Sequence, residues 1–100
     1  NNEKAAIDEK AALKKQIIKD YSKGGDEVAF PDHKLKEGTS DDVEYIGKVV
    51  IEIEEFSEDN AKIYAGYWRS EGGYAWYKRT APGVWVRTAY EDYMGEIHYD

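Results

Sequence analysis

The second half of the chain alternates between apolar and polar residues, with only very short interruptions. The stretches with this alternation are VEYIGKVVIEIEEF, AKIYAGYWR, YAWYKRT and VWVRTAY, and a last run, YMGEIHY, is a candidate fifth. A period of two is typical of strands with one buried face. The connections SEDN, SEGG and APGV are too short for parallel crossovers. We therefore expect an antiparallel meander of four or five strands.

The first part of the chain has the composition of a helix. Residues 3–23, EKAAIDEKAALKKQIIKDYSK, are rich in Ala, Lys, Glu and Leu, which are good helix formers. Asn2 is a candidate N-cap, and the glycine pair after residue 23 is a candidate stop. Leu13 and Ile17 lie on one stripe, so the helix needs an apolar surface to lie on.

Together these patterns predict an α+β fold, with the N-terminal helix packed on a four- to five-stranded antiparallel meander sheet. Residues 1–100 have the length of a single domain. We expect a helix in residues 3–23, an irregular connection in 24–42 and the antiparallel sheet in 43–99. Pro31 prevents a long helix in the connection, where the preceding VAF suits a short strand.

The net charge of −7 is distributed unevenly. Residues 24–60 carry three lysines against twelve acids, whereas residues 61–100 carry five basic and five acidic residues. A nucleic-acid-binding chain normally has a basic excess, so we expect no nucleic-acid partner. Attraction to an anionic membrane surface is disfavoured for the same reason. No apolar run approaches transmembrane length, so no membrane insertion of this segment is expected.

The chain contains no Cys, which excludes disulfides and thiolate metal sites. It begins at Asn1, without Met, in the polar segment NNEKAAIDEK. Such a start suits the mature end left by removal of a secretory signal, and equally the point at which a longer chain was cut. We expect an extracytoplasmic bacterial protein that is secreted, periplasmic or lipid-anchored.

Hairpin arithmetic sorts the strand residues into two faces. If the three connections are loops of two or four residues, the sequence numbers of two facing residues add up to an odd number. The face that holds Ile51 and Ile53 is then the core beneath the helix. It gains Val49, Tyr64, Gly66, Trp68, Ala75, Tyr77, Val84, Val86 and Tyr90. The other face carries the candidate binding residues: Tyr67, Arg69, Tyr74, Trp76, Lys78, Trp85 and Arg87.

That second face has two interpretations. A row of Tyr and Trp on a small sheet is often packing, with Lys and Arg stems lying over the rings. The same rings beside Arg are also the usual anchors of a protein interface. On this arithmetic Tyr67 lies opposite Trp76, and Lys78 lies opposite Arg87. As a binding surface, the face favours a protein partner over a small ligand, although a small anionic or carbonyl-rich ligand also suits the paired cations.

Recognisable catalytic and metal-binding motifs are absent from the sequence. His33 and His98 lack the HExxH or HxH spacing of a metal site, and no Ser has the GxSxG context of a nucleophile elbow. Glu52 and Glu54 are predicted to share a strand face, where a carboxylate pair is suited to acid–base chemistry. With 21 acids in the chain, such pairs arise by chance. We therefore expect no enzymatic activity, no metal and no cofactor.

The closing hairpin, YAWYKRTAPGVWVRT, turns an alternating strand through Gly into a Trp-bearing strand. With the long N-terminal helix and the meander, it resembles the cystatin-like and NTF2-like α+β domains. The resemblance covers residues 3–90 in outline and implies a helix followed by an antiparallel meander. A bacterial SH3-like barrel also uses strands like WYKR and GVWVRTAY, and there the helix is an appendage.

Two functions follow from these patterns. The first is a small bacterial binding domain that uses the aromatic and basic sheet face. The alternative is an acidic immunity or enzyme-inhibitor protein, whose segment Asp41–Asp59 masks a basic partner by charge steering. An enzyme that uses a carboxylate pair in the sheet is the third and weakest option.

Overall fold

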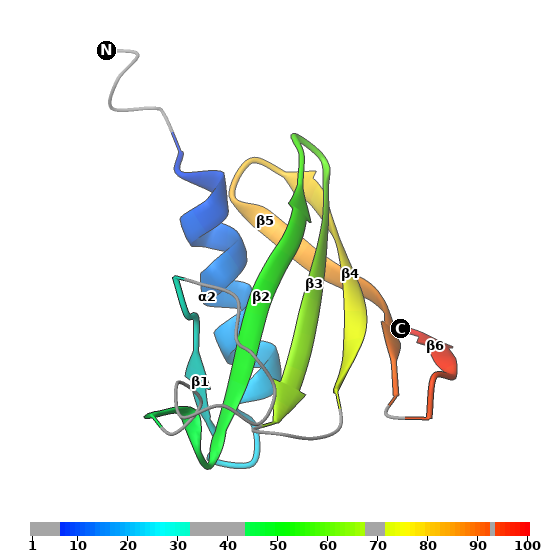
Figure 1. The fold of residues 1–100 in the computed structure, drawn as a ribbon. Helices are drawn as coiled ribbons and strands as arrows, with labels where there is room; N and C mark the ends of the chain where they lie inside the picture. The colour runs from blue at the N-terminus through cyan, green and yellow to red at the C-terminus, as the bar shows by residue number, and fades with distance from the viewer. Residues whose placement is uncertain (1–6, 33–43, 68–71, 93) are drawn as a thin grey trace.

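The structure is a computed structural model that describes residues 7–32, 44–67, 72–92 and 94–100. The helix, α2 (Glu9–Tyr21), is followed by the strands β1 (Glu27–Ala29), β2 (Lys48–Phe56), β3 (Asn60–Tyr67), β4 (Gly72–Ala81), β5 (Val84–Glu91) and β6 (Ile97–Tyr99). All the strands form one sheet in the order β1-β2-β3-β4-β5-β6. Figure 1 shows α2 lying against one face of this sheet. The predicted α+β class is confirmed, and the sheet is larger than the four or five strands expected.

The sheet is antiparallel from β2 to β6, as the short connections predicted. β1 pairs with β2 in parallel, with Val28 beside Val49. A parallel pair needs a long connection, and residues 30–47 provide it. The short strands β1 and β6 add to the two edges of the meander; β6 is the candidate fifth strand, and β1 makes the sheet larger than predicted.

Helix α2 begins later than the predicted start at residue 3. Asp8 is its N-cap, and an Oδ1 atom of this residue accepts a hydrogen bond of 3.1 Å from the Ala11 N–H. Leu13 and Ile17, one turn apart, are fully buried against the sheet. The helix ends before Ser22, and the predicted cap at Asn2 lies outside the described residues.

The core lies between α2 and the sheet. Leu13 and Ile17 pack there against small and aliphatic side chains of β2 and β3 and against two aromatic rings, Tyr77 and Trp85. The buried members of this cluster are Leu13, Ile17, Val49, Ile51, Ala61, Ile63, Ala75, Tyr77 and Trp85. Each large apolar side chain contributes about 1.5–3 kcal/mol when fully buried. Aromatic rings therefore supply much of the core, as the composition requires.

Several strand registers differ from the predicted ones. In the β3–β4 pair, Ile63 faces Ala75, so the sums of facing residue numbers are even and not odd. The β2–β3 pairing shifts between Ile53 and Glu55. The β4–β5 pairing shifts twice, between Trp76 and Tyr77 and between Arg79 and Ala81. Each one-residue shift moves the following side chains to the opposite face.

The shifts correct the predicted faces for β3 and β5. Ala65 lies on the side that α2 covers, which we call the helix face, and Tyr64 lies on the other side, which we call the open face. Trp85 likewise lies on the helix face, and Val84 and Val86 lie on the open face. The β2–β3 and β3–β4 registers each differ by one residue from the predicted ones. The two differences cancel, so the faces predicted for β4 are correct. The described side chains of the open face include Lys62, Tyr64, Tyr74, Trp76, Lys78, Val84, Val86, Ala89, Ile97 and Tyr99.

Candidate functional site

The residues predicted to form one aromatic and basic surface are divided between the two faces. Tyr74, Trp76 and Lys78 lie on the open face, as expected. The prediction is wrong for Trp85 and Arg87, because Trp85 pairs with Arg79 and Arg87 pairs with Tyr77 on the helix face. Arg69 and the side chain of Tyr67 lie outside what the structure describes. The predicted pairs Tyr67–Trp76 and Lys78–Arg87 are not formed, because Lys62 and Ala89 face Trp76 and Val86 faces Lys78.

Trp85 is a core residue held by the helix. Its ring is 2% exposed and lies 5.6 Å from the ring of Phe56. Its Nε1 atom donates a hydrogen bond of 3.1 Å to Oε1 of Glu9, in the first turn of α2. Both carboxylate oxygens of Glu9 also accept from the Gly83 N–H at 3.1 Å. Glu9 thus satisfies two donors of the β4–β5 hairpin, and the side chain of Trp85 has no free polar atom for a partner.

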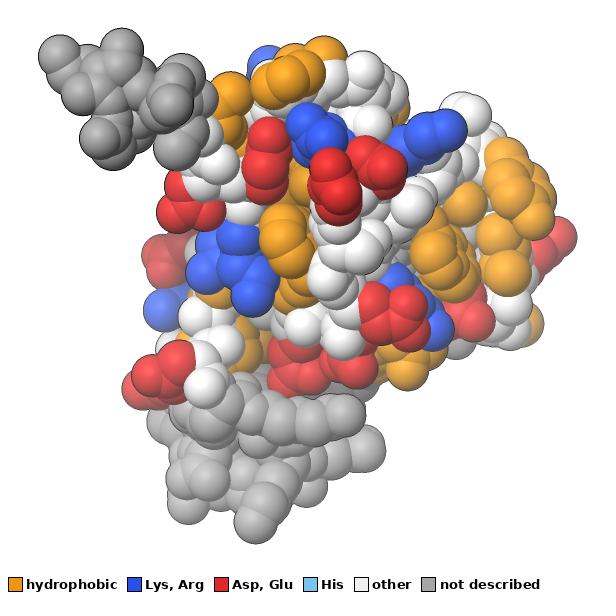
Figure 2. All heavy atoms as spheres, turned by 90° about the horizontal axis from the view of Figure 1, so that it is seen from above, with side chains coloured by type: hydrophobic (Ala, Val, Ile, Leu, Met, Phe, Trp, Pro, Cys, Tyr) orange, Lys and Arg blue, Asp and Glu red, His pale blue; other side chains and the backbone are white. Residues whose placement is uncertain are grey.

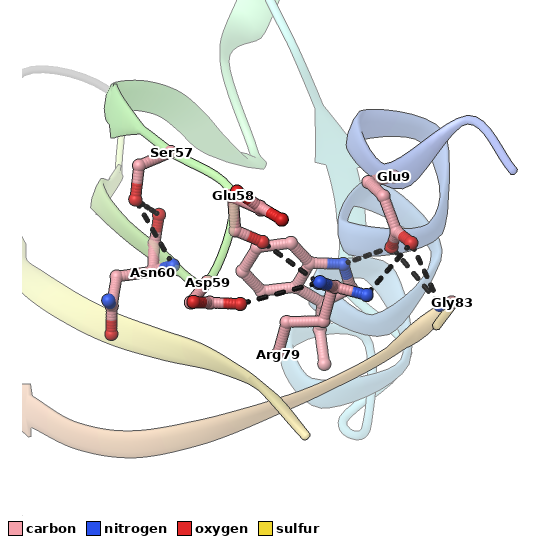
Figure 3. Close-up of polar contacts among 8 residues, drawn as sticks. Glu9, Ser57, Glu58, Asp59, Asn60, Arg79 and Gly83 are labelled. Atoms are coloured by element: carbon pink, nitrogen blue, oxygen red, sulfur yellow. Dashed lines mark hydrogen bonds and ion pairs between the residues drawn. The ribbon is translucent and has the colours of Figure 1, made fainter. Parts of the chain in front are cut away.

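Arg79 joins three parts of the chain beside Trp85. Its Nη1 atom lies 3.5 Å from Glu9, its Nε donates to the Glu58 carbonyl at 2.8 Å, and its Nη2 lies 3.4 Å from Asp59. Figure 3 shows Arg79 between the helix and the turn that carries Glu58 and Asp59. Seen from above in Figure 2, acidic and basic side chains alternate over this end of the molecule. This end is therefore a mixed surface in which acidic groups have basic neighbours.

Arg87 anchors the other end of the helix face. Its Nε and Nη2 atoms donate hydrogen bonds of 2.7 and 2.9 Å to the two carboxylate oxygens of Asp100. Its guanidinium also lies over the rings of Tyr90 and Tyr21, at 4.4 and 5.7 Å. The hydrogen bonds from Arg87 hold the pKa of Asp100 below its usual range. Burial raises the pKa of Tyr21, and its hydrogen bond with Arg87 opposes that rise.

A cleft of about 300 Å³ lies beside Arg87. It is lined by Tyr21, Val49, Ala65, Gly72, Gly73, Tyr74, Arg87, Tyr90, Glu91 and Asp92. The cation in this cleft is already paired with Asp100, and two further carboxylates lie in the lining. The cleft therefore offers no uncompensated positive charge for an anionic ligand.

The open face contains a larger hollow, of about 430 Å³. Its lining comes from Asn60, Ala61, Trp76, Tyr77, Thr88, Ala89, Ile97 and Tyr99. Trp76 and Ala89 face each other across β4 and β5, and Ala89 faces Tyr99 on β6. The register therefore places one row of apolar side chains across three strands. In Figure 2, hydrophobic side chains are uncovered on the side of the molecule where β6 lies in Figure 1.

The exposed part of the open face is unusually apolar for a surface. In the lining of the hollow Ile97 is 44% exposed and Tyr99 is 83% exposed, and Val86, on the same face of β5, is 45% exposed. Contiguous exposed apolar residues of this kind are typical of interaction sites. Sequence reasoning missed Ile97 and Tyr99 as site residues, because a three-residue strand gives too little alternation to assign its face. Val86 was missed because the shift in β5 was not foreseen.

Two lysines lie on the open face beside the hollow. The Nζ atom of Lys62 lies 4.3 Å from the centre of the Tyr74 ring and 6.0 Å from that of Trp76. Lys78 is exposed and faces Val86. Within the described part of the chain, neither ammonium group makes an ion pair, whereas Arg79 and Arg87 on the helix face are both paired. The open face therefore combines the aromatic floor of the hollow with two nearby cations that are open to a partner's carboxylate.

A group that is able to bind a metal lies at the turn before β6. Asp92, Glu96 and His98 each bring one ligand atom to within 4.8 Å of the others. The Asp92 carboxylate also accepts hydrogen bonds of 2.9 Å from the Met94 and Glu96 N–H groups and lies 2.8 Å from His98 Nε2. These bonds lower the pKa of Asp92, with that to His98 having the largest effect. The DxxxExH spacing was the sequence signal for this cluster, and its bonds organise the turn.

Comparisons of the chain with protein-family models, with curated proteins and with solved structures find no match. The resemblance to cystatin-like and NTF2-like domains therefore stays a prediction. Among the described residues, no helix is long and apolar enough to cross a membrane.

Proposed function

We propose that this chain is a small binding domain that takes up a protein partner on its open face. The observation that carries the proposal is the hollow of about 430 Å³ with Trp76 in its floor. Its lining is made of aromatic, aliphatic, amide and hydroxyl side chains, which suit contact with a partner better than acid–base chemistry. The domain therefore acts by binding and not by catalysis.

The energetics of the surface favour a protein partner. Tyr99 stands almost free in water at 83% exposure, and an aromatic side chain buries roughly 150–250 Å² when it is covered. Trp and Tyr are also enriched among the residues that dominate interface energies. A partner that covers Trp76 and Tyr99 together therefore gains most of its binding energy from these two rings.

The two lysines define the chemistry of that partner. Lys62 and Lys78 flank the apolar row and have no ion-pair partner among the described residues. The chain as a whole has a charge of −7, but charges more than about 8 Å apart are largely screened at physiological ionic strength. Contact charge therefore favours a partner with apolar residues and at least one nearby carboxylate.

Selection from a random library of linear peptides displayed on phage tests this function. We expect selected peptides to be apolar and acidic. Trp76→Ala should weaken their binding by about 30-fold or more, the effect of a hot spot of about 2 kcal/mol. Tyr99→Ala, at an exposed position, should do the same without altering the far-UV circular dichroism spectrum. Ile46→Ala is the matched control, because Ile46 is 52% exposed and lies before β2, away from the hollow.

Binding that is insensitive to Trp76→Ala and Tyr99→Ala contradicts the proposed surface. Selection of basic peptides whose binding depends on Glu54 and Glu55 instead supports the acidic inhibitor alternative. Those two glutamates are exposed on β2, close to the β2–β3 turn. The two functions therefore predict opposite charges in the selected peptides.

A further inference from the structure

The turn between β5 and β6 holds an imidazole and two carboxylates close together. Asp92, Glu96 and His98 each offer one ligand atom, and these atoms lie within 4.8 Å of one another. The main chain of the turn is closed by two hydrogen bonds of 2.9 Å, from the Asp92 N–H to the Glu96 carbonyl and from the Gly95 N–H to the Asp92 carbonyl. Gly95 has a φ of 85°, which suits glycine and permits this tight turn. The backbone alone therefore keeps Asp92 and Glu96 near each other.

Two of the three side chains are also held in orientation. Oδ1 of Asp92 accepts hydrogen bonds from the N–H groups of Met94 and Glu96, so Oδ2 is left to face Nε2 of His98 at 2.8 Å. The His98 ring stacks on the ring of Tyr90, with centroids 5.1 Å apart and an interplanar angle of 21°. Metal ligands in proteins are commonly oriented by such second contacts. Asp92 and His98 therefore present their ligand atoms with little freedom left to lose.

The third side chain, that of Glu96, is not explained by the turn. Within the part of the chain that the structure describes, its carboxylate makes no hydrogen bond and no ion pair. It nevertheless lies beside the carboxylate of Asp92, although two like charges at one site disfavour each other. The bond between Asp92 and His98 accounts for those two groups only. A divalent cation would balance both carboxylates at once.

The donor set identifies the class of ion. Imidazole suits zinc and the neighbouring divalent transition metals, whereas Mg²⁺ and Ca²⁺ take oxygen ligands. Bonds from zinc to nitrogen or oxygen of about 2.0–2.2 Å separate two ligands of a tetrahedral site by about 3.3 Å. The 2.8 Å between Asp92 and His98 and the 4.8 Å that spans the cluster bracket this value, so small side-chain rotations suffice. The side chains of His98 and Asp92 are 42% and 28% exposed, so an ion enters directly from solvent.

We infer that Asp92, Glu96 and His98 form a binding site for a divalent transition metal, with Zn²⁺ as the preferred ion. Oδ2 of Asp92, one carboxylate oxygen of Glu96 and Nε2 of His98 are the ligands, and water completes the coordination. The proton between Asp92 and His98 passes to solvent when the ion binds. This site departs from the expectation, drawn from the sequence, that the chain binds no metal. Because His98 stacks on Tyr90 on the helix face, the inference does not depend on the proposed open-face function.

Titration of the untagged protein with ZnCl₂, followed by calorimetry, measures the affinity. We expect one ion per chain and a Kd of about 1–100 µM, because an exposed site with three protein ligands binds more weakly than a closed site with four. ¹H–¹⁵N NMR locates the ion. The imidazole nitrogens of His98 and the amides of residues 92–98 should shift, while the imidazole of His33 should not. MgCl₂ at the same concentration should produce no such shifts.

Three substitutions test the three ligands. Glu96→Gln should weaken Zn²⁺ binding at least about tenfold and leave the metal-free melting temperature unchanged, since this carboxylate makes no other contact within the described residues. Asp92→Asn keeps an oxygen for the two N–H donors of the turn but removes the charged ligand, and should weaken binding similarly. His98→Ala should abolish binding. Glu54→Gln, at an exposed position in β2, and His33→Ala are the matched controls and should change the Kd by less than about twofold.

Three results would overturn the inference. Zn²⁺ binding that is lost in His33→Ala and kept in His98→Ala would place the ion elsewhere. Binding that is insensitive to Glu96→Gln would leave Asp92 and His98 as a hydrogen-bonded pair that only organises the turn. Equal affinity for Mg²⁺ and Zn²⁺ would indicate non-specific attraction to carboxylates. None of these results bears on the open-face function, which is tested with peptides and Trp76→Ala.

Discussion

The indole Nε1 of Trp85 donates a hydrogen bond of 3.1 Å to Oε1 of Glu9, 76 positions earlier in the chain. This contact joins the first turn of α2 to β5 and turns the Trp85 ring into the core. It also explains why Trp85 and Trp76, nine positions apart on neighbouring strands, lie on opposite faces of the sheet.

Glu9→Ala should lower the free energy of unfolding by about 1–3 kcal/mol, because the buried indole N–H of Trp85 loses its acceptor. Glu9→Gln keeps a carbonyl acceptor and should cost less. Urea denaturation measures both. Glu54→Ala, at an exposed position in β2, is the matched control and should stay within about 0.5 kcal/mol of the wild type. Equal effects of Glu9→Ala and the control would show that the contact does not stabilise the fold.

The two tryptophans should differ strongly in their contribution to stability. Trp85→Ala should cost about 3–5 kcal/mol, as expected for a fully buried ring. Trp76 is half-buried on the open face, so Trp76→Ala should cost roughly 1–2 kcal/mol. Urea denaturation of the two variants compares them directly. The reverse order would contradict the assignment of the two faces.

Tyr77→Phe should lower stability at neutral pH by about 1.5–3 kcal/mol. The Tyr77 hydroxyl, on a ring that is 1% exposed, donates a hydrogen bond of 2.6 Å to Oδ2 of Asp20. Phe lacks this donor to a charged acceptor. Tyr99→Phe, at an 83% exposed position, is the control and should change stability by less than about 0.5 kcal/mol.

Tyr77→Phe should also change how stability depends on pH in the alkaline range. Burial, and the bond to Asp20, raise the pKa of Tyr77 far above its ordinary value. The unfolded chain loses this proton from about pH 10, while the folded chain keeps it. The stabilisation is therefore complete below about pH 10 and is lost as the pH rises. Above pH 10, Tyr77→Phe should lose stability less steeply than the wild type, and equal slopes would count against the raised pKa.

Asp100→Asn should flatten the acid limb of the stability curve. Hydrogen bonds from Arg87 lower the pKa of Asp100 in the folded state, whereas an unfolded Asp titrates near pH 3.9. The stabilisation is therefore present above about pH 4 and is lost as the pH falls through the folded pKa. Thermal unfolding between pH 2 and 7 measures this difference. Asp26→Asn, the same change at an exposed position before β1, is the matched control.

The sequence predicted the elements well because their signals are local. The alternation in KVVIEIEEF and the other long strands is a property of neighbouring residues, and so is the helical stripe that contains Leu13 and Ile17. The turn at Pro82-Gly83 was also predictable, because Pro followed by Gly suits the two central positions of a type II turn. In the structure Gly83 has a φ of 77°, as position i+2 of such a turn requires. The three-residue strands β1 and β6 carry too little pattern to be assigned with the same certainty.

The candidate site was only partly predictable. Tyr74, Trp76 and Lys78 were placed on the correct face, but Trp85 and Arg87 were not, because one extra residue in a strand reverses the side chains up to the next shift, after which Tyr90 is again on the predicted face. Such a shift leaves no mark in the alternation itself. The shifted register is stabilised by hydrogen bonds to other parts of the same chain: Trp85 donates to Glu9, and Arg87 donates to Asp100.

The sequence by itself determined that this protein has one amphipathic helix followed by an antiparallel meander, because each element depends on the spacing of its own apolar residues. The tertiary structure alone decided that the Trp85 ring became core and that Val84 and Val86 became surface. That choice depends on strand register, and register is set by the burial and hydrogen bonding of residues that are distant in the chain.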